Sequence, residues 1–279
     1  MCVDLACHDC LRDGRQVVMN NARDNIALYE QEAHWNRNYL EDPFYRSKVR
    51  LIQGMTPDGV KTVLDVGCGN GTIINAFDSD YWVVGCDRSK ASLGYVRGRA
   101  VQSSADALPF MDRSFDLVMS HQMLEHLPNG VLERTVKELM RVSARYLMVS
   151  VPHKDRLAQQ LARCAMCGEK YHIWGHLRCF NNVSDLRRLF PSFSLRVHAF
   201  CGRENEYMTK IGLGVRQRIG GRWAYDPIAV CPLCGSREQY QAGFPRRAIA
   251  AIVDRLDRLI PKQKEFWWLV CLFERSDCS

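Results

Sequence analysis

The stretch Val63-Leu64-Asp65-Val66-Gly67-Cys68-Gly69-Asn70-Gly71-Thr72 decides the fold of this chain. An apolar strand runs directly into three glycines at alternate positions. Glycine lets the backbone turn tightly and lets a ligand approach where a Cβ would collide. A helix that starts after such a turn adds unpaired N–H groups and the positive end of its dipole. The stretch therefore predicts a strand and a tight turn at a ligand-binding site.

One acidic residue precedes this turn, and another ends the next strand along the chain. Asp65 stands two residues before Gly67, and a second apolar strand, Tyr81–Cys86, ends on Asp87. An acid at the tip of the second strand is the usual partner of a ribose diol. A dinucleotide-binding domain would carry the spacing Gly-x-Gly-x-x-Gly. Here the third glycine follows the second after one residue, which suits a ligand without phosphates.

In this order, and followed by Ser104–Phe110 and Ser114–Val118, these residues resemble the class I S-adenosylmethionine-dependent methyltransferases. The likeness is closest to the small-molecule branch that includes ubiquinone-pathway O-methyltransferases. It covers roughly residues 25–200, with further matches at His121–Pro128 and Gly175–Phe180. It implies S-adenosyl-L-methionine as cofactor and an α/β fold. That fold is a Rossmann-like seven-stranded sheet with helices on both faces and an antiparallel last strand.

The resemblance also implies roles for single residues. The three glycines pass close to the methionine and ribose parts, Asp65 orients the methionine amino group, and Asp87 accepts the ribose hydroxyls. His121 lies beside the reactive methyl. The full set of expected cofactor-binding residues is Trp35, Asp65, Gly67, Gly69, Gly71, Asp87, Arg88, Asp106, Ala107 and His121, with Asp106 and Ala107 at the adenine edge.

A base is needed where the acceptor is a hydroxyl, and histidine titrates near neutrality. His126 and His121 are the leading catalytic candidates, with His153 and His176 behind them. A related subgroup has an additional acid at the position of Gln122, so we expect no catalytic divalent metal there.

Composition and charge restrict the class of acceptor and the cellular location that we expect. The chain has 279 residues and a net charge of +7, without the dense Lys/Arg clusters of a dedicated nucleic-acid binder. We therefore expect a small-molecule or glycan acceptor and not a nucleic acid. The excess of cations, including Arg178, Arg203 and Lys210, favours an anionic acceptor. No run reaches the ~18 apolar residues of a membrane span. The acids in Met1–Asp13 argue against a signal peptide, so we expect a cytoplasmic location.

The chain divides into four expected parts. Residues 1–54 form an N-terminal segment with cofactor-covering helices, 55–200 the methyltransferase core, 201–261 an insertion, and 262–279 the last strand of the core sheet. Arg246–Leu259 reads as an amphipathic basic helix, and we expect its apolar stripe to be a core face and not a membrane contact. The expected strands are 62–67, 81–86, 100–103, 115–120, 146–151, 194–200 and 266–273.

Two cysteine knuckles are the sharpest feature outside the core. Cys164-Ala165-Met166-Cys167-Gly168 and Cys231-Pro232-Leu233-Cys234-Gly235 together supply four thiolates, the ligand set of a structural zinc. Four thiolates fill the coordination sphere, so this zinc would not activate water. It would instead hold in place a loop beside the acceptor pocket.

Other readings of the cysteines stay open. A local zinc site would use Cys164, Cys167, Cys179 and either His172 or His176, and two redox pairs are a third reading. The 13 cysteines also include a group near the N-terminus, where Cys2, Cys7 and Cys10 lie close to His8 in the sequence. We expect this segment to be an irregular terminus without a metal site.

The sequence thus predicts O-methylation of a small molecule, a sugar, or a glycan or lipid-linked acceptor. We expect that acceptor between the N-terminal helices, the loop after Pro152 and the insertion. One alternative is an RNA methyltransferase with a structural zinc. However, the fourth strand ends in Ser120–Met123 and lacks the Asn/Asp-Pro-Pro-aromatic motif that clamps a nucleobase amine. The other alternative is a non-catalytic cofactor-binding scaffold, against which the intact glycines and acids argue.

Overall fold

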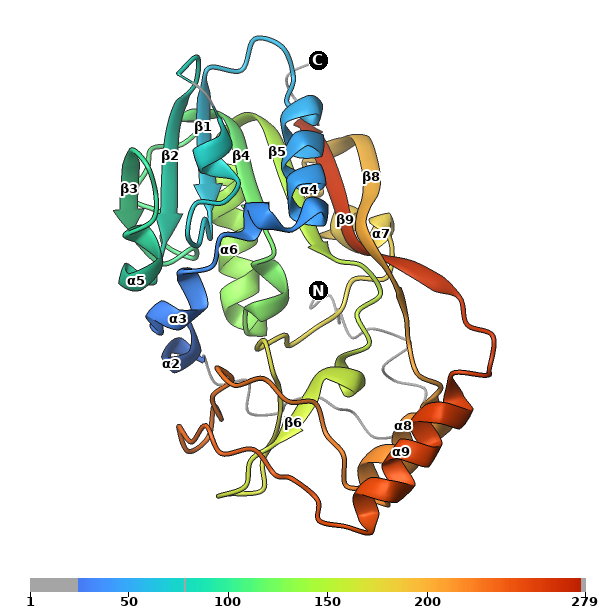
Figure 1. The fold of residues 1–279 in the computed structure, drawn as a ribbon. Coiled ribbons are helices and arrows are strands. Elements are labelled where there is room, and N and C mark those ends of the chain that lie inside the picture. Colours follow the sequence, from blue (N-terminus) through green and yellow to red (C-terminus); the bar gives the residue numbers. More distant parts are fainter. Residues whose placement is uncertain (1–24, 78, 277–279) are drawn as a thin grey trace.

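The computed structural model describes residues 25–77 and 79–276. Its centre is a seven-stranded sheet in the order β3-β2-β1-β4-β5-β9-β8 (Figure 1). The first five strands are parallel, whereas β9 is antiparallel to both of its neighbours. The strands are β1 Thr62–Val66, β2 Trp82–Asp87, β3 Arg99–Gln102, β4 Phe115–His121, β5 Ser143–Pro152, β8 Phe193–Glu206 and β9 Lys264–Arg275. All seven expected strands are therefore present, and the mixed Rossmann-like sheet is confirmed.

Alternation along the strands explains why both faces of the sheet are covered. On β1, Leu64 and Val66 belong to one apolar cluster with residues of α6 and α7, while Val63 belongs to another with Ile52 of α4. Successive side chains of a strand point to opposite faces, so each apolar residue serves one layer. The helices of the core are α2 Ile26–Tyr29, α3 Glu32–Trp35, α4 Pro43–Met55, α5 Lys90–Leu93, α6 Asn129–Val142 and α7 Val183–Leu189, with 3-10 turns η1 Tyr39–Glu41, η2 Ile74–Ala76 and η3 Leu124–His126.

Local signals fix the helix that closes one face. Asp42 precedes α4, its Oδ1 accepts the N–H of Phe44 at 2.8 Å, and Pro43 occupies the first helical turn. An acidic N-cap followed by proline is a strong start signal. The helix buries Lys48, Val49 and Ile52 against the sheet.

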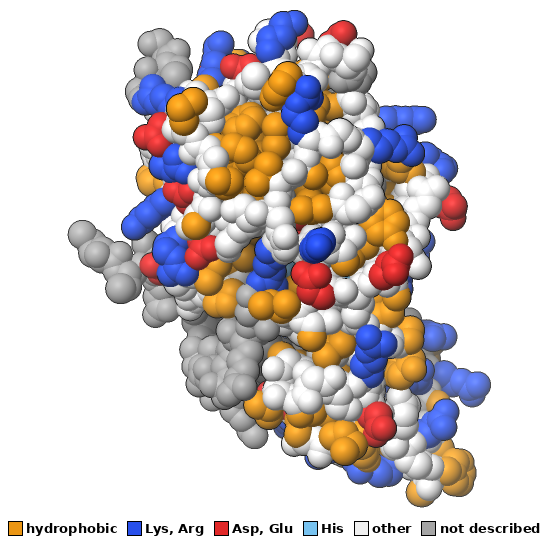
Figure 2. Space-filling model, turned by 90° about the vertical axis from the view of Figure 1, so that its left-hand side faces the viewer, with side chains coloured by type: hydrophobic (Ala, Val, Ile, Leu, Met, Phe, Trp, Pro, Cys, Tyr) orange, Lys and Arg blue, Asp and Glu red, His pale blue; other side chains and the backbone are white. Residues whose placement is uncertain are grey.

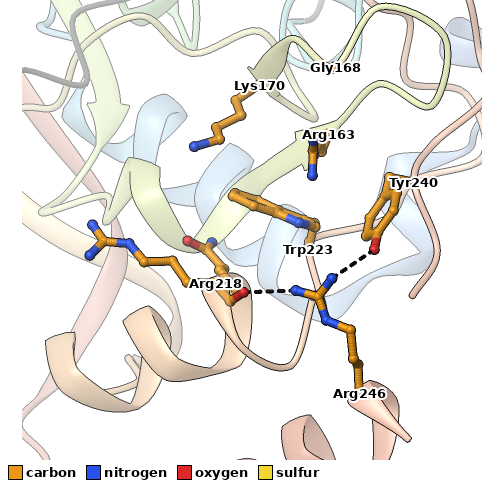
Figure 3. A pocket seen from close by; sticks show the side chains of 9 residues that line it. Arg163, Gly168, Lys170, Arg218, Trp223, Tyr240 and Arg246 are labelled. Atoms are coloured by element: carbon orange, nitrogen blue, oxygen red, sulfur yellow. Dashed lines mark hydrogen bonds between the residues drawn. The ribbon is translucent and has the colours of Figure 1, made fainter. Parts of the chain in front are cut away.

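A second unit lies beyond one end of the sheet, below it in Figure 1. We call it the cysteine module and define it as residues 157–173 and 207–260. It holds η4 Leu157–Gln160, the hairpin β6 Leu161–Arg163 and β7 Lys170–His172, α8 Lys210–Arg218 and α9 Arg246–Asp257. Its apolar centre is small: Ala162, Cys164, Tyr171, Ile173, Ala229 and Cys231. A cavity of about 300 Å³ opens between the hairpin, α8 and α9 (Figure 3).

The expected amphipathic helix is present as α9. The expectation that its apolar stripe is a core face is wrong. Ile252, Leu256 and Leu259 are 58%, 60% and 79% exposed. The helix packs on α8 through small and polar residues instead. A Cβ on Gly220 would lie 2.8 Å from that of Ala250, and Asp257 Oδ1 accepts the hydroxyl of Thr209 at the start of α8. Close approach through small residues leaves the larger side chains outside the contact.

The surface shows the charge balance of the sequence. In the view of Figure 2, Lys and Arg side chains spread over the whole face, and apolar side chains gather in its upper part. No helix of the described residues is long and apolar enough to cross a membrane.

Candidate functional site

The glycine turn is held by the tip of the neighbouring strand. Gly67 and Cys68 donate their N–H groups to the carbonyl oxygen of Cys86, and Asp87 Oδ2 accepts the N–H of Gly69 at 2.9 Å. Gly69 has φ +53°, and a Cβ there would lie 2.7 Å from the Trp35 ring. The turn therefore needs glycine both for its backbone conformation and for the close approach of the ring.

Asp65 lies under this turn and is buried. Its Oδ1 has no hydrogen-bond partner among the described residues. Burial, and then the nearby charge of Asp87, raise the pKa of Asp65 to about 7. A buried carboxylate oxygen without a partner at a ligand-binding turn fits a cationic group such as the methionine amino group. The described residues thus satisfy the expected cofactor in two independent respects, the glycine cradle and this orphaned acceptor.

Sequence reasoning missed Lys48 of α4, whose charge acts on both Asp65 and His121. It is 2% exposed, and its Nζ lies 4.5 Å from the centroid of the Trp268 ring. Burial lowers the pKa of Lys48 to about 8, and the charges of Cys201, Glu125 and Asp65 oppose that shift. A lysine on an amphipathic helix gives no sequence signal that separates a buried cation from a solvated one.

The N-terminal segment covers the glycine turn. Besides its ring over Gly69, Trp35 accepts a hydrogen bond on its carbonyl oxygen from Asn70 Nδ2 at 2.9 Å. The hydroxyl of Ser89, just after β2, donates to the carbonyl of Tyr29 at 2.8 Å, and the Arg88 guanidinium lies 5.4 Å from the Tyr29 ring centroid. The structure thus brings Trp35 and Arg88 to the turn that the sequence assigned to the cofactor.

Asp106 and Ala107 lie in the loop after β3. Asp106 Oδ2 accepts two hydrogen bonds from Arg134 of α6, at 2.7 and 3.0 Å. Hydrogen bonds from Ser104 and Arg134 lower the pKa of Asp106. The carboxylate is therefore already paired, and the adenine contact stays a prediction for this loop as a whole.

His121 ends β4 and is 6% exposed. Its Nδ1 lies 3.0 Å from the hydroxyl of Ser150 on β5, and its Nε2 has no partner among the described residues. Burial and then Lys48 hold the pKa of His121 well below its ordinary value, so the imidazole is neutral near pH 7. In this neutral form it can position a neighbour by hydrogen bonding.

His126 is half-buried and joins four buried residues in a group that we call the histidine cluster: Glu125, His126, Asp155, His172 and His176. Glu125 and His126 follow β4, and Asp155 follows β5. His172 is the last residue of β7, and His176 lies in the segment after it. The rings of His126 and His176 lie 4.8 Å apart, and those of His172 and His176 stack at 4.4 Å. The cluster therefore joins the carboxyl ends of two core strands to the cysteine module.

Hydrogen bonds within the cluster assign its protons. His172 Nδ1 accepts the N–H groups of Trp174 and His176, so neutral His172 carries its proton on Nε2, 3.7 Å from Asp155 Oδ2. His176 Nδ1 lies 2.6 Å from the same oxygen and donates to it. The neutral form of His176 then carries its lone pair on Nε2, which no described residue engages. A carboxylate that fixes the tautomer of a histidine in this way is the arrangement of a supported base.

His126 is restrained on its other side. Its Nδ1 lies 2.7 Å from the hydroxyl of Tyr29. Burial and the neighbouring His176 hold the pKa of His126 well below its ordinary value. Burial also raises the pKa of Glu125 to about 7, and neither oxygen of that carboxyl has a hydrogen-bond partner among the described residues. His153 stays outside the cluster and packs on Phe200, with 4.6 Å between ring centroids.

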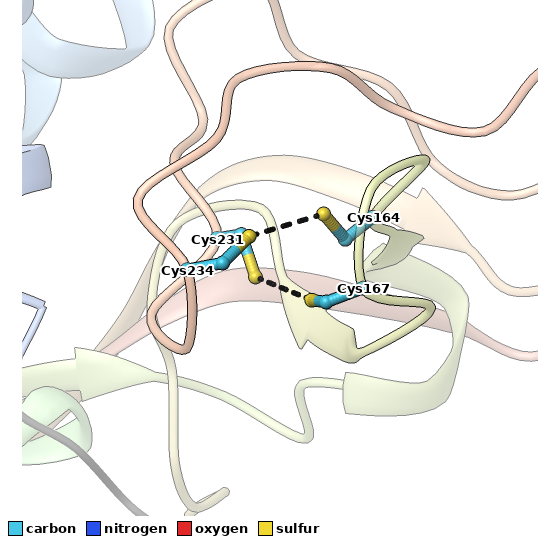
Figure 4. Close-up of side chains that lie close together, drawn as sticks. All are labelled: Cys164, Cys167, Cys231 and Cys234. Carbon is cyan, nitrogen blue, oxygen red and sulfur yellow. Dashed lines mark hydrogen bonds between the residues drawn. The ribbon is translucent and has the colours of Figure 1, made fainter.

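The four cysteines of the two knuckles come together in the cysteine module (Figure 4). Cys164 Sγ lies 3.6 Å from Cys234 Sγ, Cys167 Sγ lies 3.6 Å from Cys231 Sγ, and all four sulfurs lie within 4.8 Å of one another. The backbone explains the meeting: Cys164 bridges to Gln239, and Ala165 donates its N–H to Glu238.

The alternatives for these cysteines fare differently. The local site from one knuckle, Cys179 and a histidine is not assembled, because His172 and His176 face Asp155. The N-terminal Cys2, Cys7, His8 and Cys10 lie outside the described residues. Of the cations expected to favour an anionic acceptor, Arg178 is used structurally: it is largely buried and donates to the carbonyls of Leu127 and Leu124.

Comparisons with known proteins agree with this geometry. A family model described as a methyltransferase domain matches residues 63–145. An Encephalitozoon cuniculi protein, provisionally assigned as a methyltransferase, is 27% identical over 63% of this chain and 77% of its own. A ubiquinone biosynthesis O-methyltransferase of Pseudomonas putida is 31% identical over 40% of this chain, which spans only 55% of that relative.

Solved structures support the fold. A Bacillus halodurans protein, also provisionally assigned as a methyltransferase, superposes with a TM-score of 0.52 at 16% identity, over 82% of this chain and 99% of its own. Taken together with the glycine turn and its acids, these likenesses support a class I S-adenosylmethionine-dependent methyltransferase domain in this chain.

Proposed function

We propose that the protein methylates a hydroxyl of a small molecule, a sugar, or a glycan or lipid-linked acceptor, with S-adenosylmethionine as donor. The observation that carries this is the placement of the histidine cluster at the carboxyl ends of β4 and β5, next to the glycine turn. Ligands of open α/β sheets bind at this edge. The bound donor supplies an activated methyl group. The residues of this chain need only align the acceptor and remove its proton.

His126, the base expected from the sequence, and His176 form the proton-accepting pair of this proposal. Asp155 holds the proton of His176 on Nδ1, so its Nε2 lone pair is ready to accept the hydroxyl proton. The hydroxyl of Tyr29 and the ring of His176 restrain His126. His121 lies at the tip of β4, where we place it beside the reacting methyl group.

Incubation of the protein with labelled S-adenosylmethionine and separate pools of small molecules, glycans and total RNA tests the substrate class. We expect label in the first or second pool. Label confined to RNA would favour the RNA methyltransferase alternative, and the described residues offer it no counterpart of the nucleobase clamp. Cofactor binding with no label in any pool would favour the scaffold.

We also propose that Cys164, Cys167, Cys231 and Cys234 hold one structural zinc. Zinc–sulfur bonds of about 2.3 Å in a tetrahedron put neighbouring sulfurs about 3.8 Å apart. The closest pairs here, at 3.6 Å, match that spacing, whereas a disulfide needs about 2.05 Å. Elemental analysis of protein purified without chelator should find about one zinc per chain. A metal-free protein, or full zinc retention in the Cys231→Ser/Cys234→Ser variant, would contradict this ligand set.

A further inference from the structure

The cavity of the cysteine module is lined by cations and aromatic rings. Arg163 and Lys170 come from the β6–β7 hairpin, Arg218 from the end of α8, and Arg246 from the start of α9 (Figure 3). No carboxylate is among its lining residues. Within the part of the chain that the structure describes, none of these four cations forms an ion pair. Three positive charges, those of Arg163, Lys170 and Arg246, therefore border about 300 Å³, whereas the Arg218 guanidinium points away and only its backbone faces Arg246.

The hairpin places two of these charges at a cost. Arg163 and Lys170 are directly opposite each other in the antiparallel β6–β7 ladder. Side chains at such positions share a face, and like charges there are destabilising. The other face of β7 is occupied by Tyr171, which packs in the apolar centre of the module. An anion bound between the two cations would turn this repulsion into attraction.

All four cations are exposed, but contacts within the module restrain three of them. Arg246 donates to the carbonyls of Arg218 and Ile219, both at 2.8 Å, and to the hydroxyl of Tyr240 at 3.3 Å. A guanidinium has five N–H donors, so part of its donor set stays open to a ligand. The Arg163 guanidinium lies 5.1 Å from the Tyr240 ring centroid, and Lys170 Nζ lies 5.1 Å from that of Trp223.

We propose that this cavity is a binding site for a phosphorylated small molecule. Its phosphate or diphosphate group would lie between Arg163, Lys170 and Arg246, and its organic part against the Trp223 ring. Guanidinium groups match phosphate oxygens in charge and geometry. The volume is at the lower end of small-molecule pockets, which suits one phosphate ester and not a bulky lipid body. The site does not depend on methyl transfer, since all of its lining residues belong to the cysteine module.

Calorimetry and Trp fluorescence on the full-length, metal-loaded protein test the proposal, with inorganic phosphate, pyrophosphate and uridine monophosphate as probes. We expect pyrophosphate to bind more tightly than phosphate, with an affinity that falls as salt rises. Arg163→Gln and Lys170→Gln should each weaken pyrophosphate binding about tenfold, the size expected for one charge-assisted hydrogen bond. Arg187→Gln, an exposed arginine of α7 outside the cavity, is the matched control and should bind as the wild type does.

A second readout separates loss of the ligand from loss of the fold. Without ligand, the Lys170→Gln variant should unfold at the same or a higher temperature than the wild type, because the cross-strand repulsion is relieved. The proposal is overturned if none of the three probes binds at millimolar concentration. It is also overturned if Arg187→Gln weakens binding as much as the cavity variants do.

Discussion

Asp65→Asn should make the protein more stable and its cofactor binding weaker. The carboxyl is buried, and its pKa rises from 3.8 to about 7 in the folded state. A group whose pKa is raised by folding opposes folding once it must ionise. The penalty is absent below about pH 4, grows as the pH rises, and is complete above about pH 7. Each pKa unit is worth about 1.4 kcal/mol, so roughly 4 kcal/mol of unfolding free energy is at stake.

Urea denaturation of the cofactor-free protein at pH 5 and pH 8 measures this effect. We expect Asp65→Asn to gain up to about 4 kcal/mol over the wild type at pH 8 and much less at pH 5. The exposed Asp58→Asn is the control and should show no such pH-dependent difference. An equal pH dependence in the wild type and in Asp65→Asn would refute the reasoning, because the carboxyl would then not be the group that ionises at a cost.

The same substitution removes the anionic partner of the cofactor amino group. Calorimetry with S-adenosylhomocysteine at pH 7.5 should show a loss of roughly 1.5–3 kcal/mol, about 10- to 100-fold in affinity. In the wild type, affinity should rise between pH 6 and pH 7.5, as Asp65 ionises, and this rise should be smaller in the variant. A more stable variant that binds the cofactor normally would remove Asp65 from the cofactor site without changing its buried state.

Four further substitutions probe the turn and the base. Asp87→Ala removes the acceptor of the Gly69 N–H and should weaken cofactor binding by roughly 1.5–3 kcal/mol in calorimetry; unchanged affinity would refute the assignment. Gly69→Ala should destabilise the protein more than Gly59→Ala in thermal unfolding, because both have positive φ but only at Gly69 would a Cβ meet another side chain. His126→Ala and His176→Ala should each lower turnover about 10²-fold with cofactor affinity intact, and wild-type turnover in both would exclude the pair as the base.

The core could be predicted from the sequence because its signals are local. Strands with apolar runs end on Gly67 and Asp87, and the turn chemistry follows from residues only a few positions apart. The meeting of Cys164 and Cys167 with Cys231 and Cys234 is long-range, yet four thiolates in two knuckles imply a shared ion whatever the path of the chain between them. That zinc itself stays a proposal.

The parts that could not be predicted depend on packing between distant segments. Asp155 and His176 meet only because the β6–β7 hairpin folds back toward the end of β5, and nothing near Asp155 in the sequence marks it as a partner of a histidine. The exposure of the α9 stripe has a similar cause. Periodicity identifies an apolar face, but the contact through Ala250 and Gly220 decides which side of the helix meets α8.

One short hairpin joins the four-cysteine site to the histidine cluster. β6 runs directly into Cys164, and its partner β7 ends on His172, two residues beyond Lys170. The apolar centre around Tyr171 is small, so the zinc that we propose at the four-cysteine site would supply much of the stability of the hairpin. Metal removal should therefore lower turnover by displacing His172 and the Asp155–His176 pair. Cofactor affinity, which rests on β1 and β2, should hardly change. Metal-free protein with full turnover would show that the hairpin keeps the histidines in place unaided, and a parallel loss of cofactor affinity would show that the core itself had unfolded.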